Sequence, residues 1–207
     1  MIRNIVFDMG MVLLTYDPME ACIRHARGNR ELAARLCNAI FFHPEWGPYI
    51  DGGLTTDLGY MERVEQRLTD PAEQALAANI LSDWHLDGTY PRMEMRPVVQ
   101  DLLDRGFRLY LLSNVGYSFD AFKYKMPYLD RFSGIMLSCQ EKLTKPDMAI
   151  YRRLCDKFGL KAEECLFIDD VQANIDGAEA AGLHSYCYAD GDVVRLKAAF
   201  AALPKPE

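Results

Sequence analysis

The chain has 207 residues, of which 50% are hydrophobic and 26% charged, with a formal net charge of −7. This composition excludes a disordered chain, and no apolar run approaches the roughly 20 residues of a bilayer span, which excludes a membrane protein. The acidic balance argues against a nucleic-acid surface, which needs excess positive charge. An anionic small molecule remains open as a ligand, because a bound metal makes a site locally positive.

The N-terminal segment and the cysteines indicate a cytoplasmic protein. Asp8 places a carboxylate where a signal peptide needs its apolar stretch, so we expect no secretion. The six cysteines include no Cys-x-x-Cys pair, and a chain of this size does not need disulfides for stability. We therefore expect buried free thiols in a reducing compartment, and a nucleophilic cysteine is the weaker interpretation.

Short apolar runs bounded by polar residues or glycine predict buried parallel strands. They lie at residues 2–7, 107–112, 134–138, 164–168 and 184–189. Helical patterns that each end at a glycine separate the later runs, at residues 97–106, 146–159 and 172–182. This alternation predicts an α/β fold, with a parallel sheet and helices on both of its faces.

Residues 16–92 differ from the rest, because they show helical patterns and no convincing strand. Asp70-Pro71 followed by Glu73 is a capping-box start for one helix. A second helix is expected to begin at Thr55-Thr56 and to carry apolar residues at helical spacing, namely Leu58, Met61, Val64 and Leu68. We therefore predict a helical cap of residues 16–92, inserted into a core of residues 1–15 and 93–207.

Polar groups follow the predicted strands at their carboxyl ends, where ligands bind in an open α/β sheet. These groups are Asp8, Ser113-Asn114, Lys145-Pro146 and Asp169-Asp170. Three carboxylates brought together repel one another and need a cation. A site rich in oxygen donors fits a hard divalent ion such as Mg²⁺.

These residue types suit phosphoryl transfer. An aspartate such as Asp8 can accept a phosphoryl group as an acyl phosphate, while a metal bridges its carboxylate to a phosphoryl oxygen. Lys145 would neutralise the charge on the nucleophile and the phosphate. Ser113 and the backbone N–H groups after it would hold phosphoryl oxygens, with help from Asn114.

Four motifs in order resemble those of the haloacid dehalogenase (HAD) superfamily over essentially the whole chain. They are Phe7-Asp8-Met9-Gly10-Met11-Val12, Leu112-Ser113-Asn114, Lys145-Pro146-Asp147, and Phe167-Ile168-Asp169-Asp170 with Asn174 and Gly177-Ala178. The resemblance implies a Rossmann-like core with a helical cap inserted after the first strand. It also implies that Asp8 is the covalent nucleophile. Mg²⁺ would be held by Asp8, the Gly10 carbonyl and Asp170, with Asp169 supporting it directly or through water.

One position departs from the superfamily pattern. Its phosphatases usually carry an acid/base aspartate two residues after the nucleophile, where this chain has Gly10. Loss of a general acid/base costs roughly 10²–10⁴-fold in rate, so a catalytically impaired phosphate-binding or regulatory protein is the alternative. A subgroup with Asp-x-Gly-Asn-Val at this motif includes sugar-phosphate phosphatases, although Met11 replaces its Asn. Asp17 is a candidate substitute acid, but Asp17-Pro18 is better explained as a helix start.

We therefore expect a Mg²⁺-dependent phosphatase that acts on a small phosphorylated metabolite, with sugar phosphates among the candidates. Dehalogenase activity is disfavoured, because it does not explain the Asp169-Asp170 pair. Trp46 and Tyr49 either contact the leaving group or pack within the cap, and packing is favoured. Lys142 is expected to be a solvated charge. Neither nucleic acid nor membrane is expected as a partner, and the oligomeric state is left open.

Overall fold

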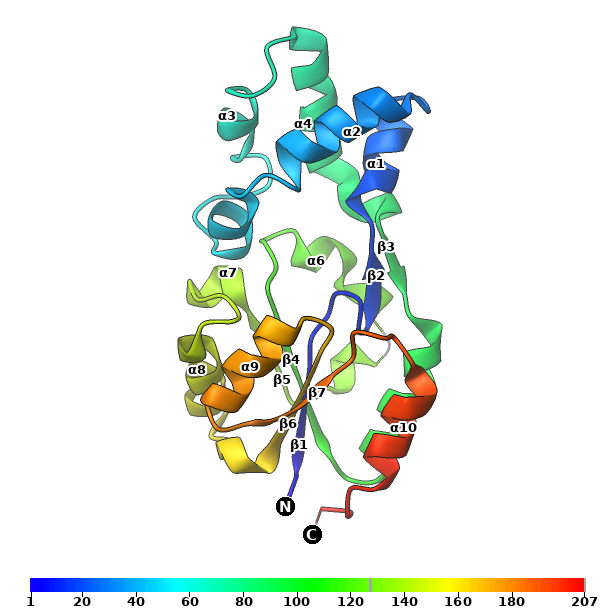
Figure 1. Ribbon diagram of the computed structural model, residues 1–207, viewed down its shortest axis with the longest axis vertical. Coiled ribbons are helices and arrows are strands. Elements are labelled where there is room, and N and C mark those ends of the chain that lie inside the picture. The colour runs from blue at the N-terminus through cyan, green and yellow to red at the C-terminus, as the bar shows by residue number, and fades with distance from the viewer. Residues whose placement is uncertain (127, 207) are drawn as a thin grey trace.

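In the computed structural model, residues 1–126 and 128–206 are described, and among them five parallel strands form one sheet (Figure 1). The strands are β1 (Asn4–Phe7), β4 (Arg108–Ser113), β5 (Gly134–Leu137), β6 (Cys165–Asp169) and β7 (His184–Cys187), in the order β5-β4-β1-β6-β7. All five coincide with the apolar runs of the sequence. The predicted α/β fold is confirmed.

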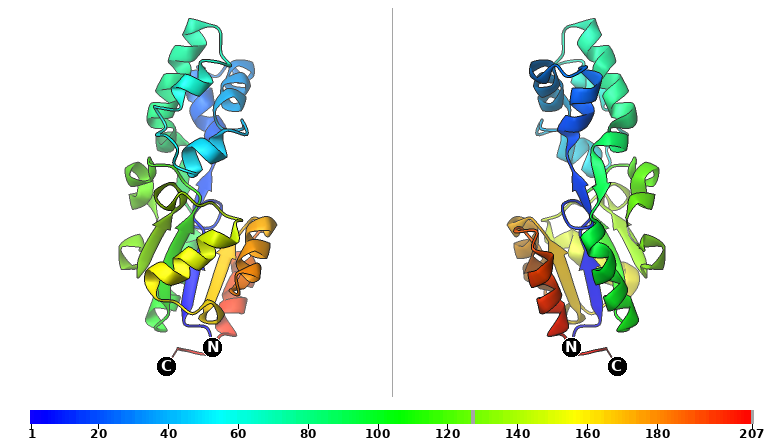
Figure 2. Two further views of the ribbon diagram at one scale, coloured as in Figure 1. Left: turned by 90° about the vertical axis from the view of Figure 1, so that its left-hand side faces the viewer. Right: turned by 90° about the vertical axis from the view of Figure 1, so that its right-hand side faces the viewer.

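Helices cover both faces of the sheet (Figure 2). One face carries α5 (Arg96–Asp104) and α10 (Val193–Ala201), and the other carries α8 (Met148–Phe158) and α9 (Gln172–Ala180). Alternate residues of each strand supply the two layers, so that Ile5 and Phe7 of β1 pack in the first layer and Val6 in the second. Burial on both sides explains why the strands are apolar throughout.

Short helical segments complete the part of the chain that surrounds the sheet. They are η2 (Met93–Met95), α6 (Phe119–Phe122), η3 (Lys123–Lys125), η4 (Leu129–Arg131), α7 (Ser138–Glu141) and η5 (Ala162–Glu164). Of these, α7 follows β5 directly and leads into the segment that contains Lys145.

The segment after the first strand forms the helical unit, which we define as α1 to α4. Its elements are α1 (Pro18–His25), α2 (Arg30–Ile40), the π-helical turn η1 (Gly47–Asp51), α3 (Met61–Val64) and α4 (Pro71–Asp87). The helical unit lies above the carboxyl edge of the sheet in Figure 1. The predicted start of α4 is confirmed, since the Asp70 side chain accepts a hydrogen bond from the Ala72 N–H at 2.8 Å.

The helix expected from Thr55-Thr56 is wrong in its start and its extent. The helix α3 begins only at Met61, and Leu58 is exposed. The Thr56 hydroxyl accepts the Gly59 N–H at 3.2 Å, which closes a turn. Threonine side chains compete with the helix in this way, and Gly59 adds a residue of low helix propensity.

Two short antiparallel strands connect the helical unit to the sheet, and the expectation of no strand in residues 16–92 is wrong at its two ends. They are β2 (Leu14–Tyr16) and β3 (Thr89–Pro91), with Tyr16 opposite Thr89. The chain enters the helical unit through β2 and leaves it through β3, and the two strands pair, so that each provides hydrogen-bond partners for the backbone of the other. A three-residue strand leaves little periodic signal in the sequence.

The cysteines and the helices of the described residues add two observations. All six cysteines are free thiols, four of them buried. Among the described helices, none combines the length and hydrophobicity needed to cross a membrane.

Candidate active site

The sequence-predicted polar residues converge at the carboxyl edge of the sheet. Asp8 follows β1, Ser113 ends β4, Asp169 ends β6, and Lys145 lies between α7 and α8. The parallel pairing of β1 with both β4 and β6 brings these strand ends together. Residues that are more than 130 positions apart in the chain therefore share one site.

Lys145 is buried between two carboxylates at the centre of the site. Its Nζ lies 2.6 Å from Asp8 Oδ1 and 2.6 Å from Asp169 Oδ2. Burial alone would lower the pKa of Lys145, but Asp8 and Asp169 outweigh it and raise that pKa above its usual value. Burial raises the pKa of Asp8 to about 6, against the opposing effect of Lys145. The ammonium is therefore retained, and it is a fixed positive charge beside Asp8.

Asp169 is fully buried and accepts hydrogen bonds from three residues. Besides Lys145, the Val171 N–H donates to its Oδ1 at 2.8 Å, and Asn174 Nδ2 lies 3.0 and 3.1 Å from its two oxygens. These donors fix the carboxylate and use most of its acceptor capacity. Asp169 therefore orients Lys145, and Asn174 of the fourth motif helps by holding the Asp169 carboxylate in place.

Asn114 binds the main chain of Lys145 rather than only facing the pocket. Its Nδ2 donates to the Lys145 carbonyl at 2.9 Å, and its Oδ1 accepts the Lys145 N–H at 2.8 Å. One N–H of the amide remains for a ligand. The side chain thus positions the lysine, a role that sequence reasoning did not assign.

Gly177 allows α9 to lie against the segment that carries Lys145. A Cβ at this position would sit 2.2 Å from the backbone oxygen of Pro146, closer than real contacts permit. Glycine is therefore required here by close packing rather than by an unusual backbone angle. Its place in the fourth motif has a structural reason.

Three carboxylates at the site could hold a metal ion. Oxygen atoms of Asp8, Asp169 and Asp170 all lie within 4.8 Å of one another. This all-oxygen donor set fits Mg²⁺. Because Asp169 is committed to Lys145, Val171 and Asn174, the carboxylates with free capacity are those of Asp8 and Asp170. Burial and the nearby Asp169 raise the pKa of Asp170 above its usual value.

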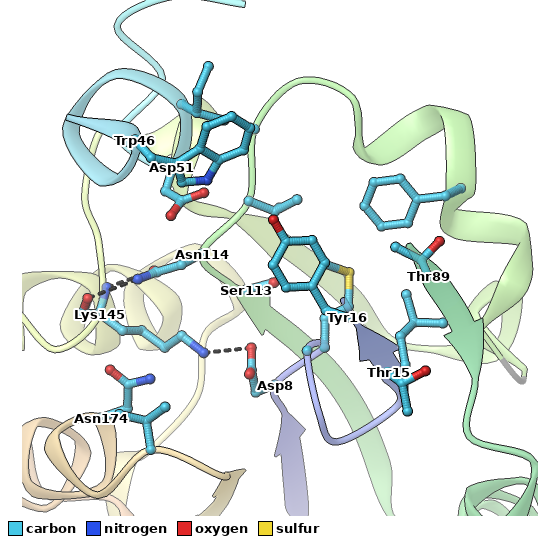
Figure 3. A pocket seen from close by; sticks show the side chains of 18 of the residues that line it. Asp8, Thr15, Tyr16, Trp46, Asp51, Thr89, Ser113, Asn114, Lys145 and Asn174 are labelled. Atoms are coloured by element: carbon cyan, nitrogen blue, oxygen red, sulfur yellow. Dashed lines mark hydrogen bonds and ion pairs between the residues drawn. The ribbon is translucent and has the colours of Figure 1, made fainter. Parts of the chain in front are cut away.

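A pocket of about 320 Å³ opens beside Asp8, between the sheet and the helical unit (Figure 3). Ser113, Asn114 and Lys145 line it from the sheet side, and Trp46 and Asp51 line it from η1 and the residue before it. Apolar and aromatic side chains make up much of the remaining wall: Met9, Leu14, Tyr16, Ile50, Trp84, Val115, Phe122 and Val171. Ser113 is buried, and its hydroxyl bonds no described residue, so it remains free for a ligand.

Trp46 and Tyr49 were each expected either to contact the leaving group or to pack within the cap, and the structure places them differently. Trp46 lines the pocket and also packs on Phe41, with the ring centroids 4.8 Å apart. Tyr49 is absent from the lining and lies under the Arg63 guanidinium, 5.1 Å from its ring centroid. Trp46 therefore both faces the pocket and packs within the helical unit, whereas Tyr49 only packs.

Asp17 has the structural role that the sequence favoured. Its side chain accepts the Met19 N–H at 2.9 Å at the start of α1, and it lies outside the pocket lining. The expectation that Lys142 is a solvated charge is wrong, because its ammonium donates to the Gly53 carbonyl and, at 2.6 Å, to the Tyr117 hydroxyl. It joins α7 to the helical unit instead of being only solvated.

Sequence reasoning missed Asp51 and Tyr16 as pocket residues. Asp51 lies two residues after Tyr49, but an acidic residue at this place carries no distinguishing local pattern. Tyr16 ends β2, a strand that was itself not predicted. Only the approach of the helical unit to the sheet brings these two side chains to the site.

The whole arrangement matches a known family. The sequence model of the family of haloacid dehalogenase-like hydrolases matches residues 2–182 of this chain, a range that includes every site residue named above. The chain belongs to the haloacid dehalogenase-like hydrolases. This HAD-family chain is 24% identical to the sesquiterpene phosphatase astK of Aspergillus oryzae over 179 residues, 86% of this chain and 85% of that protein. It is 25% identical to the phosphatase MT3486 of Mycobacterium tuberculosis over 194 residues, 89% and 86% of the two chains.

Solved structures of HAD-family proteins share the fold. A predicted HAD-like hydrolase from Porphyromonas gingivalis superposes with a TM-score of 0.74 at 24% identity, covering 99% of this chain and 100% of the other. A HAD family enzyme from Bacteroides thetaiotaomicron, in complex with magnesium and inorganic phosphate, gives a TM-score of 0.69 at 20% identity, covering 90% and 94%. The expectation of a HAD-superfamily hydrolase with a Rossmann-like core is confirmed.

Proposed function

We propose that this protein is a Mg²⁺-dependent phosphatase of a small phosphomonoester, with Asp8 as the covalent nucleophile. The observation that carries the proposal is the position of Asp8 at the mouth of the pocket, held at 2.6 Å by the buried ammonium of Lys145. That geometry leaves a carboxylate oxygen exposed to a ligand in the pocket, beside a fixed positive charge.

The residues of the site would share the work of phosphoryl transfer. The Asp8 carboxylate attacks phosphorus in line with the ester oxygen, forming an acyl phosphate while the P–O bond of the ester breaks. Lys145 offsets negative charge as it develops on the transferring group, and the Ser113 hydroxyl donates to a phosphoryl oxygen. Water then attacks the phosphorus and restores the Asp8 carboxylate.

A divalent ion fits the same site. We propose that Asp8, Asp170 and the Gly10 carbonyl bind Mg²⁺, with Asp169 supporting it directly or through water. When bound, the ion would neutralise phosphoryl oxygens and keep the phosphate in line with Asp8. The magnesium and phosphate in the complex from Bacteroides thetaiotaomicron support this choice of ion.

The lining of the pocket favours an apolar alcohol over a sugar as the leaving group. Sugars need hydrogen-bonding partners for several hydroxyls, whereas the wall facing Asp8 is built mainly of side chains such as Trp46, Trp84 and Phe122. One relative is named a sesquiterpene phosphatase, which is consistent with an apolar group of this kind. We keep sugar phosphates as the second candidate. The helical unit would act as the cap that selects the substrate, in a cytoplasmic enzyme.

The test of the proposed function is hydrolysis of p-nitrophenyl phosphate by the full-length protein, with Asp8→Asn as the comparison. We expect turnover that requires Mg²⁺, is lost in EDTA, and falls by roughly 10³-fold or more in the variant, because the amide cannot attack phosphorus. The wild-type protein mixed with substrate and quenched in acid should carry one phosphoryl group on Asp8, detected by mass spectrometry.

The alternative function is a phosphate-binding or regulatory protein without turnover. It predicts binding of Mg²⁺ and inorganic phosphate, measured by calorimetry, but no hydrolysis across a panel of phosphoesters. That result would reject the phosphatase. Turnover that persists unchanged in Asp8→Asn would reject the nucleophile.

A further inference from the structure

The reaction proposed above lacks one component on the sheet side of the pocket. An alcohol leaving group needs a proton as the P–O bond breaks, and the water of the second step needs a base. Gly10 has no side chain to provide either, and Lys145 is held between two carboxylates. A second acid must therefore come from elsewhere in the lining.

Asp51 is the acidic residue that meets this need. Among the described residues that line the pocket, Asp8 and Asp51 are the only carboxylic acids. Asp17 caps α1, and Asp57 accepts the Trp84 indole N–H at 2.9 Å outside the lining. Figure 3 shows the Asp51 carboxylate projecting from η1 into the pocket, on the side opposite Asp8.

The position of Asp51 is fixed, although its carboxylate is free. Its backbone carbonyl accepts a hydrogen bond from Ser138 Oγ at 2.6 Å, and the same hydroxyl accepts the Val115 N–H at 2.9 Å. These bonds tie the end of η1 to the segment that follows β4 and to the first residue of α7. The Asp51 side chain itself makes no hydrogen bond or ion pair with any described residue, so its proton is available to a ligand.

The surroundings of Asp51 suit proton exchange near neutral pH. Burial raises the pKa of Asp51 to about 7, with Asp57 and Asp8 acting in the same direction and Lys145 opposing them. An acid/base group works best when its pKa is near the working pH. The titratable groups that face Asp51 are Asp8, Tyr16, Asp57, Cys139 and Lys145.

On the basis of the proposed phosphatase activity, we propose that Asp51, supplied by the helical unit, is the general acid and base of the reaction in place of the side chain that Gly10 lacks. In the first step Asp8 attacks phosphorus, the P–O bond to the alcohol breaks, and the Asp51 carboxylic acid gives its proton to the departing oxygen. In the second step the Asp51 carboxylate takes a proton from water. The resulting hydroxide attacks phosphorus, the acyl phosphate P–O bond breaks, and inorganic phosphate and the Asp8 carboxylate are released.

The test compares leaving groups that do and do not need a proton, in the wild type and in Asp51→Asn. For hexyl phosphate, whose alkoxide is a poor leaving group, we expect kcat/KM to fall by roughly 10²–10⁴-fold in the variant. For p-nitrophenyl phosphate, phosphorylation of Asp8 needs little acid help. We therefore expect a burst of about one nitrophenol per enzyme, followed by slow turnover, with phosphorylated protein accumulating in the mass spectrum.

The pH profile gives a second readout. Because the acid form of Asp51 is lost as the pH rises through about 7, kcat/KM for hexyl phosphate should decline above that pH in the wild type. That decline should be absent in Asp51→Asn.

Asp17→Asn is the matched control, because asparagine caps a helix as well as aspartate does. It should keep wild-type rates with both esters. Thermal denaturation of each variant confirms folding, and Asp51→Glu should recover part of the hexyl phosphate activity of Asp51→Asn.

The outcomes separate this proposal from the proposed function. If the wild type phosphorylates Asp8 and turns over both esters, and Asp51→Asn loses the same factor with each or loses nothing, the role of Asp51 is rejected while the phosphatase stands. A selective loss in Asp17→Asn would also reject it. If the wild type hydrolyses no phosphoester, both proposals fail.

Discussion

Gly10 lies in the first motif where an acid/base side chain is usual, so another residue of the molecule has to supply the proton. A Cβ added at Gly10 would meet no heavy atom within 4 Å, so the missing side chain does not reflect a lack of space. Neither is a left-handed backbone needed there, since Gly10 is not among the glycines with positive φ. The position is free to vary chemically, provided that another residue supplies the proton.

Because a side chain fits at this position, Gly10→Asp can test whether an added acid rescues the activity lost in Asp51→Asn. In the Asp51→Asn background we expect the added carboxylate to raise kcat/KM for hexyl phosphate by about 10-fold or more, because it places an acid two residues from Asp8. In the wild-type background the gain should be small, since Asp51 already serves. Gly10→Ala, which adds volume without an acid, should restore nothing; equal effects of the two substitutions would contradict the argument.

At the scale of elements, the junction between η1 and α7 positions the pocket wall. Ser138 begins α7, is fully buried, and bonds both the Val115 N–H and the Asp51 carbonyl through its hydroxyl. Lys142 at the end of α7 binds the Gly53 carbonyl and the Tyr117 hydroxyl. The helical unit is thus joined to the sheet at this junction as well as through β2 and β3.

Ser138→Ala should weaken this junction measurably. Removing the hydroxyl leaves a buried N–H and a carbonyl without their partner, so we expect the free energy of unfolding to fall by about 1–3 kcal/mol. Chemical denaturation monitored by circular dichroism measures the change. Ser82→Ala, on the exposed surface of α4, is the control and should alter stability by less than about 0.5 kcal/mol. A similarly small change in Ser138→Ala would show that the bonds contribute little.

At the scale of the whole molecule, the candidate active site draws on two parts of the chain. The sheet and the segments that follow its strands supply Asp8, Lys145 and Asp169. Much of the facing wall comes from the helical unit, which lies above the carboxyl edge of the sheet in Figure 1, and from the strands that join it, while α6 adds Phe122. The proposed nucleophile and the surface that would meet the leaving group therefore come mainly from different segments. This division lets the leaving group change while the phosphoryl-transfer residues stay the same.

The division predicts the substrate preference. Phosphates of apolar alcohols should have kcat/KM values at least about 10-fold above those of hexose phosphates, since burying an apolar group in this wall yields roughly 1.5–3 kcal/mol. Trp46→Ala should reduce that ratio, whereas Leu54→Ala, an exposed residue near η1, should not. The ratio is insensitive to the fraction of folded protein. A preference for hexose phosphates that survives Trp46→Ala would instead favour the sugar-phosphate candidate.

The sequence by itself determined the sheet, most of its covering helices and the residues at the strand ends. Those features are local: apolar runs mark the strands, and Pro, Asp and Gly mark the helix ends. Parallel pairing then requires Asp8, Ser113 and Asp169 to meet at one edge. The short strands β2 and β3 were missed because each is stabilised mainly by its pairing with the other.

Only the tertiary structure decided which residues face Asp8 across the pocket. Asp51 and Trp46 reach it because the helical unit lies against the sheet, through bonds such as that between Ser138 and Asp51, which spans 87 positions. The clamp of Asn114 on the Lys145 main chain has the same origin, across 31 positions. Contacts between distant segments leave no periodic pattern in the sequence, so the wall of the pocket became visible only in the folded chain.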